Sequence, residues 1–159
     1  MKILKKIINV LTTLIIVLGC IFLGLYVIGI VPYVVLSGSM EPTIETGSLC
    51  FINKHADFDD VQEKDIIAFK LKDGTLVTHR AVSISYEGIQ TKGDNNKNLD
   101  GGIVTEKSFV GKNIFWIPKI GYAVVACQST KGKIIVLTCI VLLFISGFLF
   151  GEDKKKKDE

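Results

Sequence analysis

Two serines flank a glycine in the segment SGSMEPT, residues 37–43, directly after a long apolar run. A serine hydroxyl becomes an effective nucleophile when a neighbouring base accepts its proton. Histidine suits that task because its side chain titrates at about 6.5. The candidate nucleophile is Ser39, and the chain holds two histidines, His55 and His79. The segment therefore indicates serine-dependent hydrolysis, with a flexible turn as the plain alternative.

A histidine base is usually oriented by a carboxylate on its other ring nitrogen. Asp94 and Asp100 lie in one polar loop, GDNNKNLDGG, and are the candidates for that carboxylate. Each residue also has a simpler interpretation: His79 as a partly buried structural histidine, His55 as a solvated loop residue, and the aspartates as turn formers. It is the combination of these residues that favours catalysis.

Two uncharged stretches frame the polar part of the chain, at residues 7–40 and 134–151. As a helix, the apolar run 7–31 would be about 37 Å long, enough to cross a hydrocarbon core of ~30 Å. Pro32 then provides a natural stop. The alternative, a cleaved signal peptide, lacks an A-x-A-like cleavage site. We therefore expect retained transmembrane helices over 7–31 and 131–151.

Lysines flank both predicted spans. Lys2, Lys5 and Lys6 precede the first, and GEDKKKKDE follows the second. An excess of lysine near the end of a span marks the cytoplasmic side. We expect a two-pass protein of the cell (plasma) membrane, with residues 1–6 and 152–159 in the cytoplasm and residues 32–130 as an extracytoplasmic domain.

The distribution of charge argues against a nucleic-acid-binding protein, and the cysteine spacing argues against a zinc site. Residues 41–133 carry twelve basic and twelve acidic residues, so the net charge of +3 belongs to the ends, which argues against a nucleic-acid partner. Cys20 and Cys139 fall within the predicted spans. Cys50 and Cys127 could form a disulfide, although Cys50 reads equally well as a small buried hydrophobe. No cysteine pair has the spacing of a zinc site.

The outer segment reads as a run of short β-strands rich in β-branched residues and separated by turn signals. We expect a mainly β domain with an N-terminal and a C-terminal transmembrane helix. The strand candidates are residues 47–54, 65–72, 75–86, 89–92 and 109–118.

Four segments carry a resemblance to a known family. SGSMEPT, DIIAF, VTHRAVSI and TKGDNNKNLD occur in the order and spacing of signal peptidase I. They look most like its endoplasmic-reticulum and archaeal-type branch, which also occurs in some Gram-positive and spore-forming bacteria. The resemblance covers about residues 30–120 and extends to the two predicted anchors.

The resemblance implies a role for each candidate residue. Ser39 matches the nucleophile, and His79 takes the place of the lysine base of most bacterial members. Asp100 matches the acidic residue that orients the histidine, and Asp94 a second acidic residue of the same loop. Ser37 matches a position that helps form the oxyanion hole. Which of the two aspartates contacts the imidazole stays open, and no metal or organic cofactor is implied.

The sequence departs from the family at Lys64, in EKDIIAF, where the family often has glycine. We expect this difference to alter a turn and not the chemistry.

The segment from Pro32 to Ser39 spans at most about 25 Å, so the nucleophile should stay near the outer membrane surface. We expect Leu36 and Met40 to line a groove for an extended substrate and to rest on the lipid headgroups.

The expected function is a membrane-bound serine endopeptidase that cleaves signal peptides from exported preproteins through an acyl-enzyme. The lipid bilayer is an expected partner and secretion machinery a candidate one. The alternatives are a dedicated processing peptidase for a few exported proteins, a non-catalytic membrane-anchored assembly protein, and a lysine base at Lys70 or Lys72. The cleavage-site preference and the oligomeric state are not readable from the residues.

Overall fold

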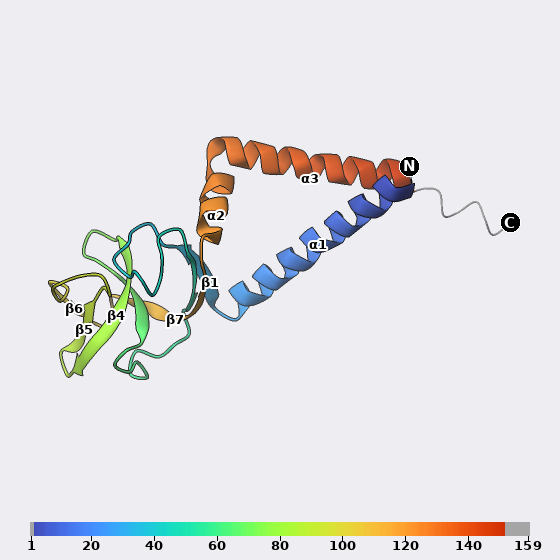
Figure 1. Cartoon of the computed structure of the whole chain (residues 1–159). Coiled ribbons are helices and arrows are strands. Elements are labelled where there is room, and N and C mark those ends of the chain that lie inside the picture. The colour runs from blue at the N-terminus through green and yellow to red at the C-terminus, as the bar shows by residue number, and fades with distance from the viewer. Residues whose placement is uncertain (1, 152–159) are drawn as a thin grey trace. The chain divides into compact units, whose positions relative to one another are not determined.

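The computed structural model describes residues 2–151, and the chain forms two units (Figure 1). One unit comprises Met1–Gly24 and Ala126–Glu159, and its described residues are mainly helical. The other, Leu25–Val125, holds the β-sheet and every candidate site residue. The four lysines that guided the predicted topology, at 154–157, lie outside the described residues.

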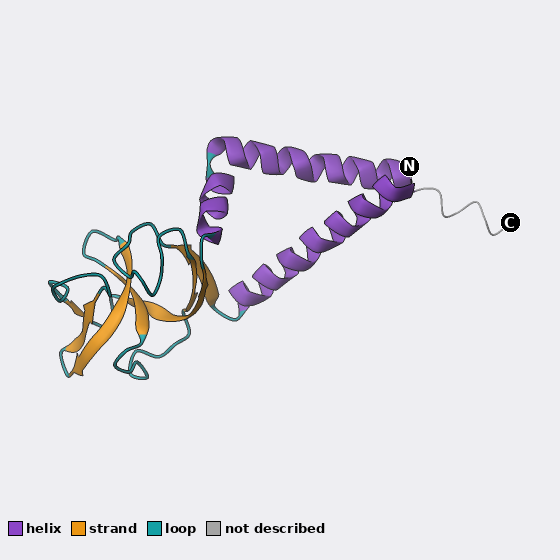
Figure 2. Cartoon of the chain, in the orientation of Figure 1, coloured by secondary structure: helices purple, strands orange, loops and turns teal. Residues whose placement is uncertain are grey.

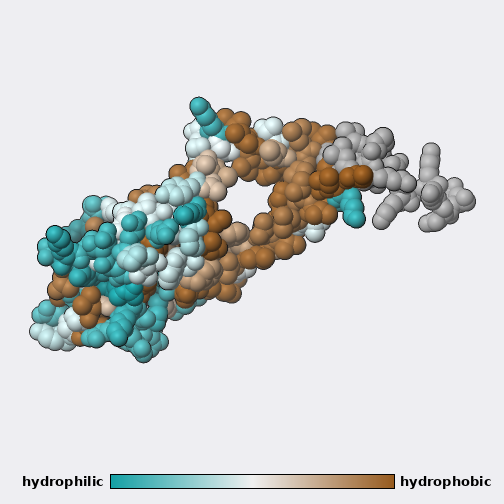
Figure 3. Space-filling view, viewed as in Figure 1, coloured by the Kyte–Doolittle hydropathy of each residue, from teal (hydrophilic) through white to brown (hydrophobic). Residues whose placement is uncertain are grey.

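Helix α1 (Lys2–Val27) carries no charged residue after Lys6 and is strongly apolar from there to its end. The stretch Lys6–Val27 has a mean hydropathy of 2.6 and is not buried within the protein, so it is long and apolar enough to cross a membrane. Figure 3 shows α1 with a largely apolar surface. The N-terminal apolar helix predicted from the sequence is thus confirmed.

Two further helices, α2 (Ile120–Gln128) and α3 (Thr130–Gly151), follow the sheet. Helix α3 covers the segment predicted as a second helix, whereas α2 was not predicted. Together, α2 and the first part of α3 are long and apolar enough to span a membrane when the bent pair is counted as one segment.

The sheet domain contains seven antiparallel strands in the order β1-β2-β7-β3-β4-β5-β6. Figure 2 shows the strands of this domain in orange, joined by loops in teal. The last strand in the chain, β7, inserts between β2 and β3. The five predicted strands are all present and correspond to β2, β3, β4, β5 and β7. The strand bounds are Ile30–Val34 (β1), Leu49–Asn53 (β2), Ile66–Lys70 (β3), Leu76–Ser85 (β4), Gly88–Lys92 (β5), Ile103–Val104 (β6) and Phe109–Ile117 (β7).

The first apolar run changes structure before its end, which corrects the sequence prediction. Helix α1 stops at Val27 and not at Val31, because Gly29 adopts a φ of 79° that L side chains rarely tolerate. The next residues pair with β2 as strand β1, with Val31 opposite Ile52. An apolar run rich in Ile and Val suits a half-buried strand as well as a helix in lipid.

The core of the sheet domain includes Met40, which is only 1% exposed and packs with Ile44, Cys50 and Ile52. The expectation that Met40 lines a substrate groove or rests on lipid is therefore wrong. A flexible apolar side chain such as that of methionine suits a buried position of this kind. Leu36, the other residue named for that role, is 78% exposed.

All four cysteines are free thiols, including Cys50 and Cys127, for which a disulfide was considered. Cys50 lies on β2 and is fully buried, as expected for a small hydrophobe. Burial raises the pKa of its thiol to about 11, because the thiolate would lose its hydration.

Candidate active site

Ser39 lies in the loop that connects β1 to β2, and the ends of this loop are tied together. The Val35 N–H donates to the Ser48 carbonyl at 2.9 Å. Within the loop, Glu41 Oε1 accepts hydrogen bonds from the Thr46 hydroxyl at 2.9 Å and from the Thr46 N–H at 3.3 Å. These contacts restrain the loop that carries the partly exposed Ser39.

His79 lies on β4, opposite Ile67 of β3, and is 7% exposed. Side chains alternate along a strand, so His79 and Ala81 face the same side and are both buried. His79 Nε2 lies 3.0 Å from Ser39 Oγ, although forty residues separate the two in the chain. The fold therefore brings the predicted nucleophile and base into hydrogen-bond contact.

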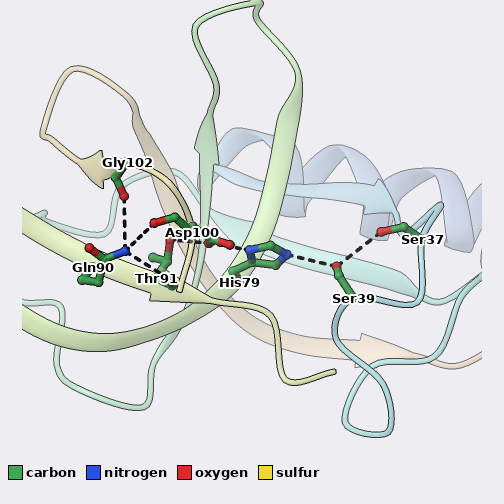
Figure 4. A network of polar contacts seen from close by, with 7 residues as sticks. All are labelled: Ser37, Ser39, His79, Gln90, Thr91, Asp100 and Gly102. Carbon is green, nitrogen blue, oxygen red and sulfur yellow. Dashed lines mark hydrogen bonds and ion pairs between the residues drawn. The ribbon is translucent and has the colours of Figure 1, made fainter. Parts of the chain in front are cut away.

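Asp100 contacts the other nitrogen of the ring. Its Oδ2 lies 2.6 Å from His79 Nδ1, and Figure 4 shows the three side chains in a line from Asp100 through His79 to Ser39. Because a carboxylate only accepts hydrogen bonds, Nδ1 carries the proton. Nε2 is then free to accept the proton of the serine hydroxyl, which is the arrangement needed for general-base activation of a nucleophile.

Asp94 has a different partner. It forms a two-pronged ion pair with Arg80, in which Arg80 Nε lies 2.7 Å from Asp94 Oδ1. The hydrogen bonds from Arg80 hold the pKa of Asp94 below its ordinary value, and Asp94 in turn raises the pKa of Arg80. Arg80 Nη1 also donates to the Lys64 carbonyl at 2.8 Å. The two aspartates of one loop therefore have separate contacts, and Asp100 is the one that touches the imidazole.

The start of the same loop packs against Ser39, the candidate nucleophile. The Asn95 N–H donates to the Ser39 carbonyl at 2.9 Å, and Asn95 Nδ2 donates to the Gly38 carbonyl at 3.2 Å. At Gly93, a β-carbon would lie 2.6 Å from the Ser39 carbonyl oxygen and 3.0 Å from His79 Nε2. Sequence reasoning missed Gly93 and Asn95, because a loop of Gly, Asp and Asn reads as an ordinary turn.

The remaining candidates lie around this centre or apart from it. Ser37 Oγ is 3.3 Å from Ser39 Oγ and is exposed. Lys70 and Lys72 are exposed and line a cavity that Asp100 also borders, whereas the side chain in contact with Ser39 Oγ is His79. His55 packs against the turn at Gly29.

Within residues 2–151, no group of three or more His, Cys, Asp or Glu side chains is placed to hold a metal ion.

A model of the family described as signal peptidase, peptidase S26, matches residues 6–108, which include Ser39, His79 and Asp100. The chain belongs to this family. The resemblance inferred from the sequence motifs is thereby confirmed.

Individual relatives come from bacteria and eukaryotes. The chain is 38% identical over 120 residues to signal peptidase I W of Bacillus subtilis, covering 68% of this chain and 63% of that protein. It is 29% identical over 104 residues to the signal peptidase complex catalytic subunit SEC11 of Colletotrichum graminicola, covering 58% and 60%. It is 32% identical over 101 residues to the human catalytic subunit SEC11C, covering 55% and 52%. The chain thus spans less than two thirds of each relative.

Proposed function

We propose that this protein is a membrane-bound serine endopeptidase that removes signal peptides from exported preproteins. The observation that carries the proposal is the contact of Ser39 Oγ with His79 Nε2 at 3.0 Å, with Asp100 on the opposite ring nitrogen. Membership of a peptidase family whose bacterial and eukaryotic members are named signal peptidases supports the substrate class.

In the proposed mechanism, Ser39 Oγ attacks the scissile carbonyl while its proton passes to His79 Nε2. General-base catalysis of this kind contributes ~10²–10⁴-fold. The Asp100 carboxylate stabilises the imidazolium that forms. The Ser39 N–H and the Ser37 hydroxyl are the proposed donors to the oxyanion, and a single such donor is worth about 3–4 kcal/mol in the transition state.

Collapse of the tetrahedral intermediate breaks the peptide bond, and His79 Nε2 gives its proton to the leaving amine. A water molecule then attacks the acyl-enzyme and again loses a proton to Nε2. The ester bond to Ser39 breaks, and the serine recovers its proton from the imidazolium. The reaction consumes one water molecule, and the described side chains carry out each step without a cofactor.

The proposed topology has α1 as one span and the α2–α3 segment as the second, with both termini in the cytoplasm. The extracytoplasmic domain would then end before α2, near residue 119, and not at residue 130 as expected from the sequence. The apolar character of α1 and the flanking Lys2, Lys5 and Lys6 support this arrangement. A nucleophile that follows a membrane helix so closely would meet substrates that are cleaved just outside an apolar segment.

Incubation of the detergent-solubilised full chain with a preprotein, followed by mass measurement of the fragments, tests the proposal. We expect a single cut beyond the apolar segment of the signal peptide. Ser39→Ala and His79→Gln should each lower the rate by at least ~10³-fold. The matched control, His55→Gln, replaces the other histidine and should leave the rate unchanged.

The same assay separates the alternatives. Equal cleavage by wild type and Ser39→Ala would defeat the catalytic proposal and favour a non-catalytic anchor. Cleavage of only a few exported proteins among many preproteins would favour a dedicated processing peptidase. Loss of activity in Lys70→Met or Lys72→Met, with His79→Gln active, would assign the base to a lysine.

A further inference from the structure

The carboxylate of Asp100 has a second contact besides His79. The Thr91 Oγ1 atom lies 2.7 Å from Asp100 Oδ2, which is the same oxygen atom that contacts His79 Nδ1 (Figure 4). A carboxylate oxygen only accepts, so the Thr91 hydroxyl donates its one proton to Oδ2. Two donors therefore converge on one oxygen of this side chain.

Thr91 is well placed to fix the carboxylate. It lies on β5, opposite Ala81 of β4, and is 0% exposed. Its β-branched side chain has restricted χ1 freedom, so the hydroxyl direction is set by the strand. The Thr91 carbonyl also accepts a hydrogen bond from the Asp100 N–H at 2.9 Å. One residue of β5 thus holds both the backbone and the side chain of Asp100.

We infer that Thr91 is a positioning residue that orients the Asp100 carboxylate toward His79, a role that rests on the proposed function. The Asp100 side chain is 21% exposed and could otherwise rotate toward water. Without the Thr91 hydroxyl, only the contact with Nδ1–H would hold Oδ2, and the carboxylate would be less firmly oriented. The imidazole would then be less often aligned for proton transfer from Ser39, so kcat should fall while KM, which reflects peptide binding, stays near its original value.

Gln90 supplies a matched control because it holds the same loop through the main chain. Its Nε2 atom donates to the Asp100 carbonyl at 2.8 Å and lies 3.4 Å from the Gly102 carbonyl. It has no contact with the carboxylate in the described structure. Gln90→Ala should therefore loosen the loop without changing the partners of Oδ2.

The kinetic test compares Thr91→Val, Thr91→Ser and Gln90→Ala in the full detergent-solubilised chain, with a preprotein as substrate. Valine keeps the shape and removes the donor, whereas serine keeps the donor. We expect Thr91→Val to lower kcat ~10–100-fold, the range for loss of a hydrogen bond to a charged group, with KM changed less than about twofold. Thr91→Ser should restore most of kcat. A wild-type kcat in Thr91→Val, or equal losses in Thr91→Val and Thr91→Ser, would overturn the inference.

A second measurement, by NMR, does not depend on catalytic activity. In a His55→Gln background the only histidine is His79, so its Nδ1–H proton can be observed by NMR in ¹⁵N-histidine-labelled protein. Loss of the Thr91 donor should shift this resonance, and Thr91→Ser should return it toward the wild-type position. If Thr91→Val does not fold, Thr91→Ala provides the same contrast. An unshifted resonance would overturn the inference, whereas a shifted resonance in a protein that cleaves no preprotein would defeat the proposed function alone.

Discussion

Asp100 Oδ2 lies 2.6 Å from His79 Nδ1, while the other ring nitrogen faces Ser39 Oγ. Asp100→Asn keeps the size of the side chain but removes the charge, and its amide can donate to Nδ1 and favour the wrong tautomer. We expect kcat for preprotein cleavage to fall ~10³–10⁴-fold with little change in thermal stability. Asp94→Asn is the matched control and should cost less activity. A larger loss in Asp94→Asn than in Asp100→Asn would reverse the roles of the two aspartates.

The close approach of Gly93 to Ser39 and His79 gives a second prediction. A methyl group there would lie 2.6 Å from the Ser39 carbonyl oxygen and 3.0 Å from His79 Nε2, so Gly93→Ala must push the nucleophile and the base apart. Since a misplacement of 1 Å can cost ~10²-fold in rate, we expect a loss of at least that size in kcat/KM. Gly101→Ala, where a β-carbon meets nothing within 4 Å, should be close to wild type. Similar rates for both variants would contradict the packing described here.

The ion pair between Arg80 and Asp94 predicts a pH dependence of stability. Because Arg80 lowers the pKa of Asp94 in the folded protein, the pair stabilises the fold above the ordinary aspartate pKa of ~3.9. That contribution is lost as the pH falls through the lower, folded-state pKa. The difference in Tm between wild type and Arg80→Gln should therefore be largest at pH 5–7 and shrink below about pH 4. Fluorescence of Trp116, the single tryptophan, can follow unfolding. A difference that stays constant from pH 7 to 3 would refute this account.

Lys64 adopts a φ of 78°, a conformation that favours glycine. Lys64→Gly should remove ~1–2 kcal/mol of backbone strain and lose ~0.5–1 kcal/mol to the greater freedom of the unfolded chain. We expect a net stabilisation of about 0.5–1 kcal/mol in chemical denaturation, with unchanged cleavage, because the Lys64 contact to Arg80 uses the backbone carbonyl. Lys72→Gly, at an exposed turn position without positive φ, should be neutral or destabilising. Equal effects of the two substitutions would argue against strain at Lys64.

Much of the architecture was predictable because its signals are local. The strands with alternating or β-branched residues were found, and so was the apolar helix α1. Strand β1 was missed because Ile30 and Val31 continue an apolar run whose composition also suits a helix in lipid. Helix α2 was missed because its nine residues show neither strong periodicity nor a capping signal.

The site was predictable as a set of residues but not as a set of contacts. The types and order of Ser39, His79 and the two aspartates indicated the chemistry. Nothing local shows that Arg80 pairs with Asp94 and thereby leaves the imidazole to Asp100. Thr91 carries no signal in the sequence, since a threonine on a strand is ordinary. Its contact with the Asp100 carboxylate depends on the pairing of β4 with β5 and on the loop after β5, which brings Asp100 back next to Thr91.

The position of β7 has a consequence for when activity can appear during synthesis. Ser39 is carried by the β1–β2 side of the sheet and His79 by the β3–β4 side, and β7 is the strand that joins them. A nascent chain that has not yet been translated through Ile117 therefore lacks the strand that joins the Ser39 side of the sheet to the His79 side. The contact between Ser39 and His79, and with it the proposed activity, would therefore arise only after β7 has been synthesised.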